Sequence, residues 1–213
     1  ISYLCKKSNK VSSHFLISQT GGIYLLVNEK HRAWHAGIAK WSKIKNINSC
    51  SIGIELDYSP NNKNNNFSKK MVSSLIKLID YLKLKYKIKN THILGHSDVS
   101  PYRKIDPGPK FPWHLLNKHN LTFKIKNVDK GYLITVKKWF NSHSIQSNKN
   151  ISIFILGYIG YDTKKALTSK YHHNLLLKAY FTRYLKSKKN TRIDKLTINF
   201  MLKHFINLIL TKN

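Results

Sequence analysis

Residues 95–113 read GHSDVSPYRKIDPGPKFPW and combine chemically reactive side chains with four prolines. Proline locks φ and lacks a backbone N–H donor, so the prolines and Gly108 prevent a regular helix or strand across this stretch. His96 and Asp106 lie ten residues apart, and Lys104 stands two residues before the aspartate. We therefore predict a rigid loop that presents these three side chains.

Histidine nitrogens and carboxylate oxygens both bind zinc, and a catalytic zinc site leaves one position for water. By spacing alone, a histidine and an aspartate ten residues apart on a loop more often belong to a polar surface. Lys104 does not bind zinc as an ammonium ion, but it can stabilise an oxyanion beside the metal. Glu55 has the apolar neighbours Ile54 and Leu56. A carboxylate among apolar neighbours needs either a partner or a function. Spacing alone favours an ion pair between Glu55 and a lysine; the alternative is a general base with a raised pKa.

The chain has 213 residues, which suggests one large domain or two small ones. Its 38 Lys and Arg against 9 Asp and Glu leave a net charge of +29, which favours polyanions such as nucleic acid or an anionic cell envelope. Residues 1–120 carry 20 basic and 6 acidic side chains, and residues 121–213 carry 18 and 3. Because this charge is evenly spread and mostly lysine, we interpret it as residue bias and expect no nucleic-acid partner.

The longest apolar run, ISIFILGYIGY over residues 151–161, is about half the roughly 20 residues that a membrane-spanning helix needs. We therefore expect no transmembrane segment. No signal peptide is visible, and the first residue is Ile rather than Met, so we expect a chain cut at its start. Cys5 and Cys50 form no zinc-knuckle or disulfide framework.

The first half of the chain alternates between strand and helix patterns. VSSHFLIS (11–18) and IYLLVN (23–28) predict a hairpin across TGG, and SIGIELDY (51–58) predicts a third strand. Apolar residues at helical spacing predict a helix from Ser68 to Tyr86, with Ser68 as its N-cap. THILGH (91–96) predicts a fourth strand with His96 at its carboxyl end. We assign these elements to one domain over residues 1–120.

The second half predicts three helices, over residues 132–143, 171–186 and 194–210, with GYIGYDTKKAL between the first two. These helices indicate a separate domain over residues 125–213. The expected fold class is α/β (α+β): a central mixed β-sheet flanked by helices, followed by a small three-helix domain.

Four segments occur in one order: VSSHFLI (11–17), RAWHAG (32–37), SIGIEL (51–56) and the stretch at 95–113. Over about residues 1–116 the chain thereby resembles the zinc-dependent N-acetylmuramoyl-L-alanine amidases of the AmpD/AmiD type. The resemblance implies zinc bound by His96 and Asp106, catalytic assistance from Lys104, and Glu55 as the acid/base. Trp34 and His35 match the segment beside the substrate cleft of the family.

Arg103, next to Lys104, is suited to bind a carboxylate of the stem peptide. His14 aligns with a family histidine that packs near the site and is usually not a ligand, so we expect a hydrogen-bonded interior histidine. The other histidines of this half are expected in surface or packing positions: His31, His92, His114 and His119.

The remaining zinc ligand of the family is a histidine upstream of the VSSH motif, and residues 1–213 contain no match to it. We expect that it lies in a segment absent from this chain, or that this is a decayed or zinc-free member. The tail resembles the three-helix peptidoglycan-binding domain fused to AmiD-type amidases, although it can also be purely structural.

The implied reaction is hydrolysis of the amide between N-acetylmuramic acid and L-alanine, in peptidoglycan or muropeptides, by a monomeric zinc enzyme. One alternative is a peptidoglycan-binding relic that lacks the first zinc ligand. Another is a basic nucleic-acid-binding protein. The expected location is the periplasm or outer membrane, with the cytoplasm as the alternative.

Overall fold

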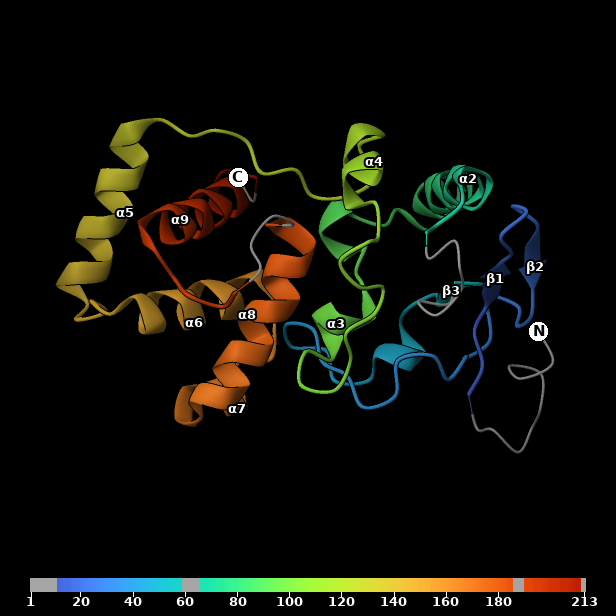
Figure 1. Cartoon of the computed structure of the whole chain (residues 1–213), viewed down its shortest axis with the longest axis horizontal. Helices are drawn as coiled ribbons and strands as arrows, with labels where there is room; N and C mark the ends of the chain where they lie inside the picture. Colours follow the sequence, from blue (N-terminus) through green and yellow to red (C-terminus); the bar gives the residue numbers. More distant parts are fainter. Residues whose placement is uncertain (1–10, 59–65, 186–189, 212–213) are drawn as a thin grey trace. The chain divides into compact units, whose positions relative to one another are not determined.

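The computed structural model describes residues 11–58, 66–185 and 190–211, which form two compact units (Figure 1). The first unit comprises the chain up to Ala39, Ile44–His96 and Asp106–Phe123. The second comprises Lys40–Lys43, Ser97–Ile105 and the chain from Lys124. The two units therefore do not divide at a single point near residues 120–125, because two short segments that precede it group with the C-terminal helices: Lys40–Lys43 and Ser97–Ile105. Cys5 lies outside the described residues.

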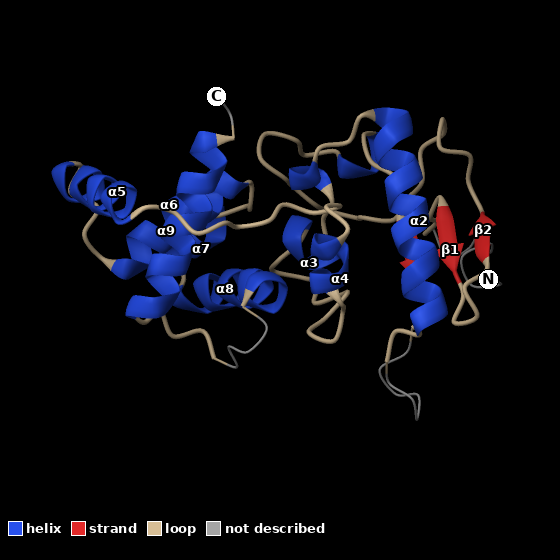
Figure 2. Ribbon diagram, turned by 90° about the horizontal axis from the view of Figure 1, so that it is seen from above, coloured by secondary structure: helices blue, strands red, loops and turns tan. Residues whose placement is uncertain are grey.

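A small mixed sheet organises the first unit (Figure 2). Its strands are β1 (Phe15–Ile17), β2 (Ile23–Leu25) and β3 (Ile54–Leu56), in the order β2-β1-β3. Strand β1 pairs antiparallel with β2 and parallel with β3, where Leu16 lies opposite Glu55. The predicted mixed sheet and hairpin are confirmed, although each strand is three residues long and shorter than its pattern suggested.

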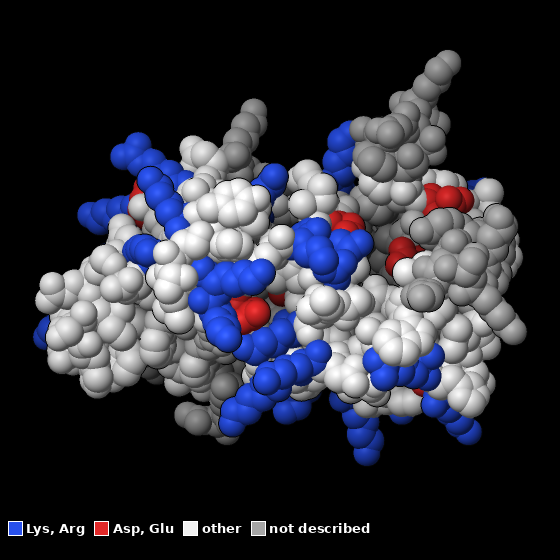
Figure 3. Space-filling view, turned by 90° about the horizontal axis from the view of Figure 1, so that it is seen from below, with Lys and Arg blue, Asp and Glu red and all other residues white. Residues whose placement is uncertain are grey.

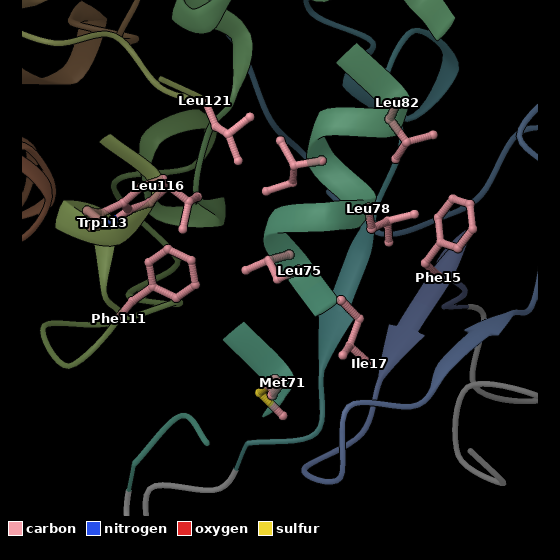
Figure 4. Close-up of a cluster of buried hydrophobic side chains, with 11 residues drawn as sticks. Phe15, Ile17, Met71, Leu75, Leu78, Leu82, Phe111, Trp113, Leu116 and Leu121 are labelled. Carbon is pink, nitrogen blue, oxygen red and sulfur yellow. The ribbon is translucent and has the colours of Figure 1, made fainter. Parts of the chain in front are cut away.

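One face of the sheet packs on helix α2 (Lys69–Tyr86). Ser68 caps this helix by accepting the Met71 N–H at 3.0 Å, as predicted. Phe15 and Ile17 of β1 are buried in the same hydrophobic cluster as α2 (Figure 4). All six apolar residues that predicted the helix are buried: Met71, Val72, Leu75, Leu78, Ile79 and Leu82.

Two histidines, His14 and His35, lie at the other face of the sheet. His14 is 1% exposed, and its Nδ1 accepts the backbone N–H of Gly53 at 3.0 Å. A Cβ built on Gly53 would lie 2.3 Å from the ring of His35, so the ring occupies the space that a side chain at residue 53 would need. Because side chains alternate along a strand, Glu55 points to the same side as His35, while Ile54 and Leu56 pack against the core.

The predicted strand over residues 91–96 is wrong. This segment contains the 3₁₀ turn η3 (Asn90–His92) and then the one-turn helix α3 (His96–Val99). The side chain of Asn90 accepts from Lys83 and donates to Asn120, which fixes the turn against α2. The apolar pair Ile93–Leu94 suited a strand, but these side-chain bonds favour a turn. The unit also contains η2 (Ile47–Ser49) and α4 (Trp113–Lys118).

The second unit has more helices than the three predicted. Its described residues form α5 (Lys130–Ser142), α6 (Asn148–Ile159), α7 (Lys164–Thr168), α8 (Lys170–Tyr184) and α9 (Lys195–Leu210). The missed α6 is capped by Ser147, whose side chain accepts the Asn150 N–H at 3.1 Å. From Ile151 its sequence is almost continuously apolar, and Phe154 is exposed although it is apolar, so the run lacks the one-sided apolar period by which the other helices were predicted.

Helices α5 and α6 both pack on α9, and α7 packs on α8. The interior of this unit is apolar and aromatic, with the fully buried side chains Phe140, Ile155, Leu156, Leu176, Leu177, Tyr180, Met201 and Leu202. Among the described residues, no helix is both long and apolar enough to cross a membrane. Lys and Arg are scattered over the face shown in Figure 3, and Asp and Glu are few there.

Gly53→Ala tests the packing of the histidine face. We expect this substitution to lower the free energy of unfolding by roughly 1–3 kcal/mol, because the new methyl group overlaps the His35 ring. Gly157→Ala in α6 is the matched control, since its Cβ would meet its nearest neighbour, Thr163, at 3.6 Å. The control should be neutral or more stable by about 0.5–1 kcal/mol. Urea denaturation followed by circular dichroism measures both, and equal stability of the two variants would contradict this packing.

His204 makes the second unit sensitive to acid. Burial, aided by the charge of Arg183, lowers the pKa of His204 to about 3, and its Nδ1 lies 3.1 Å from the Tyr180 hydroxyl. The unfolded state binds a proton near pH 6.5, so the stabilising contribution is present above that pH and is lost as the pH falls. Between pH 7.5 and pH 5 the wild type should lose about 2 kcal/mol from this group. Urea titrations of His204→Gln should show a correspondingly smaller loss, and an identical pH dependence would contradict the assignment.

Candidate functional site

His96 and Asp106 come together in the first unit. His96 Nδ1 lies 3.0 Å from Asp106 Oδ2, and His96 donates its Nε2–H to the carbonyl oxygen of Ala36 at 3.0 Å. The His96 side chain is 17% exposed and the Asp106 side chain 55%. The pair is therefore anchored on one side by a backbone carbonyl and open to solvent at the carboxylate.

The hydrogen bond between His96 Nε2 and the Ala36 carbonyl determines which species can lie between His96 Nδ1 and Asp106 Oδ2. A carbonyl oxygen only accepts, so the proton of a neutral His96 ring resides on Nε2, and Nδ1 then carries a lone pair. A lone pair and a carboxylate oxygen 3.0 Å apart repel each other unless a proton or a cation lies between them. Nitrogen and carboxylate oxygen are zinc donors with ligand distances of roughly 2.0–2.2 Å, which this separation permits. The donor set therefore fits a zinc ion.

Asn48 builds the turn that presents the Ala36 carbonyl. Its side-chain oxygen accepts the N–H groups of His35 at 3.1 Å and Ala36 at 2.8 Å, and its amide donates to Gly37 O at 3.4 Å. Asn48 is 5% exposed, so these bonds are shielded from water. Sequence reasoning missed this residue because asparagine is abundant along the chain and no spacing singles out this one.

His14 is fully engaged within the protein. Its Nδ1 accepts from Gly53, so its proton is on Nε2, which donates to the His31 carbonyl at 3.0 Å. Both ring nitrogens are used in hydrogen bonds, as expected for an interior histidine that is not a ligand. His14 contacts the His35 ring edge-on, with 5.6 Å between ring centroids.

The His35 ring adds no positive charge to the site at pH 7. Burial, together with the nearby His14 and then His96, lowers the pKa of His35 to about 4. The ring is therefore neutral at pH 7. A protonated His35 would oppose the binding of any cation at His96, so its neutrality favours a cation site.

Glu55 and Trp34 are both solvent-exposed in the first unit. Glu55 is an exposed residue of β3, pointing away from α2, so it is less desolvated than its apolar neighbours suggested. Trp34 is 52% exposed, with the Arg32 guanidinium 3.8 Å above its ring. The Trp34 backbone is held by Ser12, which accepts its N–H at 2.9 Å and donates to its carbonyl at 3.1 Å. An exposed ring on a fixed backbone is a suitable contact for a ligand.

Arg103 and Lys104 belong to a turn that groups with the second unit. Their backbone N–H groups both donate to Ser100 O, at 3.1 and 2.9 Å. Arg103 is exposed and Lys104 is partly exposed. In the chain, Lys104 precedes Asp106 by two residues, and its catalytic role stays a prediction, as does the substrate contact of Arg103.

Within residues 11–58, 66–185 and 190–211, no group of three or more His, Cys, Asp or Glu side chains is arranged to hold a metal ion. The His96–Asp106 pair therefore supplies two donors.

Comparisons with known proteins match residues 2–109 to the family Amidase_2, described as N-acetylmuramoyl-L-alanine amidase. The N-acetylmuramoyl-L-alanine amidase AmiD of Escherichia coli is 35% identical over 125 residues, which are 53% of this chain and 45% of AmiD. The 1,6-anhydro-N-acetylmuramyl-L-alanine amidase AmpD of Haemophilus influenzae is 41% identical over 105 residues, 49% of this chain and 55% of AmpD. The chain thus spans about half the length of these relatives.

The solved structure of E. coli AmiD in complex with the substrate anhydro-N-acetylmuramic acid-L-Ala-D-γ-Glu-L-Lys is similar in fold. It aligns with a TM-score of 0.78 at 23% identity, covering 100% of this chain and 84% of that one. The alignment includes the helices of the second unit as well as the sheet. With the family match extending over half of the residues, the chain belongs to the Amidase_2 family of N-acetylmuramoyl-L-alanine amidases.

Proposed function

We propose that this protein hydrolyses the amide bond between N-acetylmuramic acid and L-alanine in peptidoglycan or muropeptides, and that it does so as a zinc enzyme. The observation that carries the proposal is the His96–Asp106 pair, 3.0 Å apart, in a chain of the amidase family. The substrate class is the one on which the related AmiD and AmpD amidases are named. The cell envelope is the proposed place of action, because peptidoglycan lies there.

His96, through Nδ1, and Asp106, through its carboxylate, would hold the zinc ion. When bound, zinc supplies a Lewis acid and lowers the pKa of a coordinated water to about 7. The hydrogen bond from His96 to Ala36 O keeps the Nδ1 lone pair available to the ion, which is the usual function of such supporting bonds around a metal.

Glu55 is the proposed general base. It accepts a proton from the attacking water and passes a proton to the leaving nitrogen of L-alanine. Lys104 places its ammonium group against the oxyanion that develops on the scissile carbonyl. The Trp34 ring and His35 contact the substrate, and the Arg103 guanidinium binds a stem-peptide carboxylate.

A second candidate is a peptidoglycan-binding protein without turnover. It is favoured by one observation, that the described residues supply two metal donors rather than three. Incubation of the purified chain with murein and with anhydro-muropeptides decides between the two functions. Release of peptides with a free L-alanine amino group supports the enzyme. Stable binding with no product over many hours supports the binding protein.

Glu55→Gln keeps the shape of the side chain and removes the base. We expect the turnover number to fall by roughly 10²–10⁴-fold, with zinc content unchanged. Asp57→Asn is the matched control, because it removes an exposed carboxylate two residues away. Product release measured by chromatography should be normal in the control. Full turnover in Glu55→Gln would remove this residue from the mechanism.

Asp106→Asn and His96→Gln each remove one of the proposed zinc donors. Because affinity depends on the number of donors, both variants should lose most bound zinc on dialysis. His114→Gln, which changes an exposed histidine of α4, should retain the wild-type amount. Metal analysis by mass spectrometry measures all three. If the two site variants kept zinc like the control, the ion would have to bind elsewhere.

A further inference from the structure

Helix α2 carries a second stripe of side chains beside the one that packs on the sheet. The stripe follows the helical repeat of three and four residues, so its members lie on one side of α2: Lys69, Val72, Ser73, Ile76, Lys77 and Asp80. Together with side chains of residues 110–121, which include α4, the stripe lines a groove of about 860 Å³. Both walls of the groove belong to the first unit.

The two walls run in the same direction, because contacts hold both of their ends together. Near the start of α2, the Phe67 ring meets the Phe111 ring edge-on, with 5.3 Å between centroids. Near the end of α2, Lys83 Nζ donates to Asn120 O at 3.0 Å. In Figure 4, Phe111 accordingly lies toward the start of α2 and Leu121 toward its end.

The charged side chains differ between the two ends of the groove. Lys69 begins α2 and Lys110 precedes Phe111, so both lysines belong to the same end. Asp80 and His119 belong to the other end, about 16 Å further along α2 at 1.5 Å per residue. The described residues that line the groove include three lysines and one aspartate, so an anion is favoured, most of all at the Lys69–Lys110 end.

The floor of the groove is apolar and is supported by the core. It is formed by side chains of both walls: Phe67, Val72, Ile76, Pro112, Leu115 and Leu121. Phe67 and Ile76 pack against the hydrophobic cluster of the unit, so the floor has a fixed shape. Within α2 the backbone N–H and C=O groups bond to one another and offer no hydrogen bond to a ligand. A ligand is therefore held here by apolar contact and by charge.

These properties fit a small amphiphile better than a protein partner. The volume of the groove lies within the roughly 300–1,000 Å³ of most small-molecule sites. An extended peptide would bury backbone groups that find no partner along α2, which is costly. An acyl chain has no polar groups to satisfy. The aliphatic stems of the lysines at the rim can cover such a chain while their ammonium groups stay in water.

We propose that the groove binds a soluble single-chain amphiphile with an anionic head, of the fatty-acid class. Its chain lies along the apolar floor, and its carboxylate lies at Lys69 and Lys110, away from Asp80. This binding site goes beyond the proposed amidase function and does not rest on it. None of the residues that line the groove is a proposed zinc donor or catalytic group.

Calorimetric titration of the full chain with dodecanoate tests the proposal. Each methylene group that the floor buries changes the affinity about fourfold, so decanoate should bind about fifteenfold more weakly than dodecanoate. Dodecyltrimethylammonium has the same chain and a cationic head, and it should bind at least about tenfold more weakly because the lysines repel it. An affinity that does not depend on chain length, equal affinity for the cationic amphiphile, or no binding of dodecanoate would each overturn the proposal.

Ser73→Trp places a large ring in the groove. Because Ser73 is exposed, we expect this variant to melt near the wild-type temperature and to bind dodecanoate at least about tenfold more weakly. Leu84→Trp is the matched control, because Leu84 is an exposed residue of the same helix and does not line the groove. The control should bind like the wild type. Unchanged binding by Ser73→Trp, or an equal loss in the control, would place the ligand elsewhere.

Lys69→Glu/Lys110→Glu tests where the anionic head lies. Since each exposed ion pair contributes little and reversal replaces attraction by repulsion, we expect roughly tenfold weaker binding of dodecanoate. Lys70→Glu/Lys118→Glu is the control, because it makes the same change of net charge at exposed lysines of α2 and α4 outside the groove. At about 0.15 M salt, which screens distant charges, the control should bind within about twofold of the wild type. Equal losses in both variants would mean attraction to net charge alone and would contradict the site.

Vesicles of phosphatidylglycerol distinguish a bilayer from a free amphiphile. The net charge of +29 predicts attraction to these vesicles through the whole surface, so Ser73→Trp should sediment with them like the wild type. If Ser73→Trp lost vesicle binding and the wild type bound no dodecanoate, the ligand of the groove would be a membrane surface and the proposal would fail.

Discussion

The site depends on one hydrogen bond, from His96 Nε2–H to the carbonyl oxygen of Ala36. An imidazole has two nitrogens and, when neutral, one proton. Fixing the proton on Nε2 turns the lone pair of Nδ1 toward the carboxylate of Asp106. Two acceptors at 3.0 Å need a positive species between them, so a backbone carbonyl determines that this pair suits a cation.

Beside the His96–Asp106 pair, two histidines and a glycine determine the packing at one face of the sheet: His14, His35 and Gly53. Both ring nitrogens of His14 form hydrogen bonds, to Gly53 just before β3 and to His31 in the segment after β2, and so connect these segments to β1. Gly53 leaves room for the His35 ring, whose burial keeps it neutral. His14 and His35 therefore add no net positive charge beside the His96–Asp106 pair, in a chain whose net charge is +29.

The sequence predicted those features that are encoded by neighbouring residues. Helix α2 was predicted with its cap and its full apolar face, because Ser68 and six apolar residues at helical spacing act locally. The strand predicted at residues 91–96 was wrong, because the local preference of two apolar residues was outweighed by the side-chain bonds of Asn90. Helix α6 was missed, because its run from Ile151 to Ile159 is almost continuously apolar and has no alternation of polar and apolar faces that indicates a period.

By itself, the sequence predicted the mixed sheet, the long helix of the first half and the closeness of His96 and Asp106, although His96 lies in the one-turn helix α3 and not in the loop that the prolines suggested. Only the tertiary structure decided what surrounds that loop. The Ala36 carbonyl has no signal in the sequence, because every residue has a carbonyl group. Arg183 lies 85 residues from Asp98, so no spacing relates the two side chains before folding brings them together. Local sequence patterns encode helices and strands. The partner of a buried carboxylate is determined by the folded structure, because burying a carboxylate without a partner is costly.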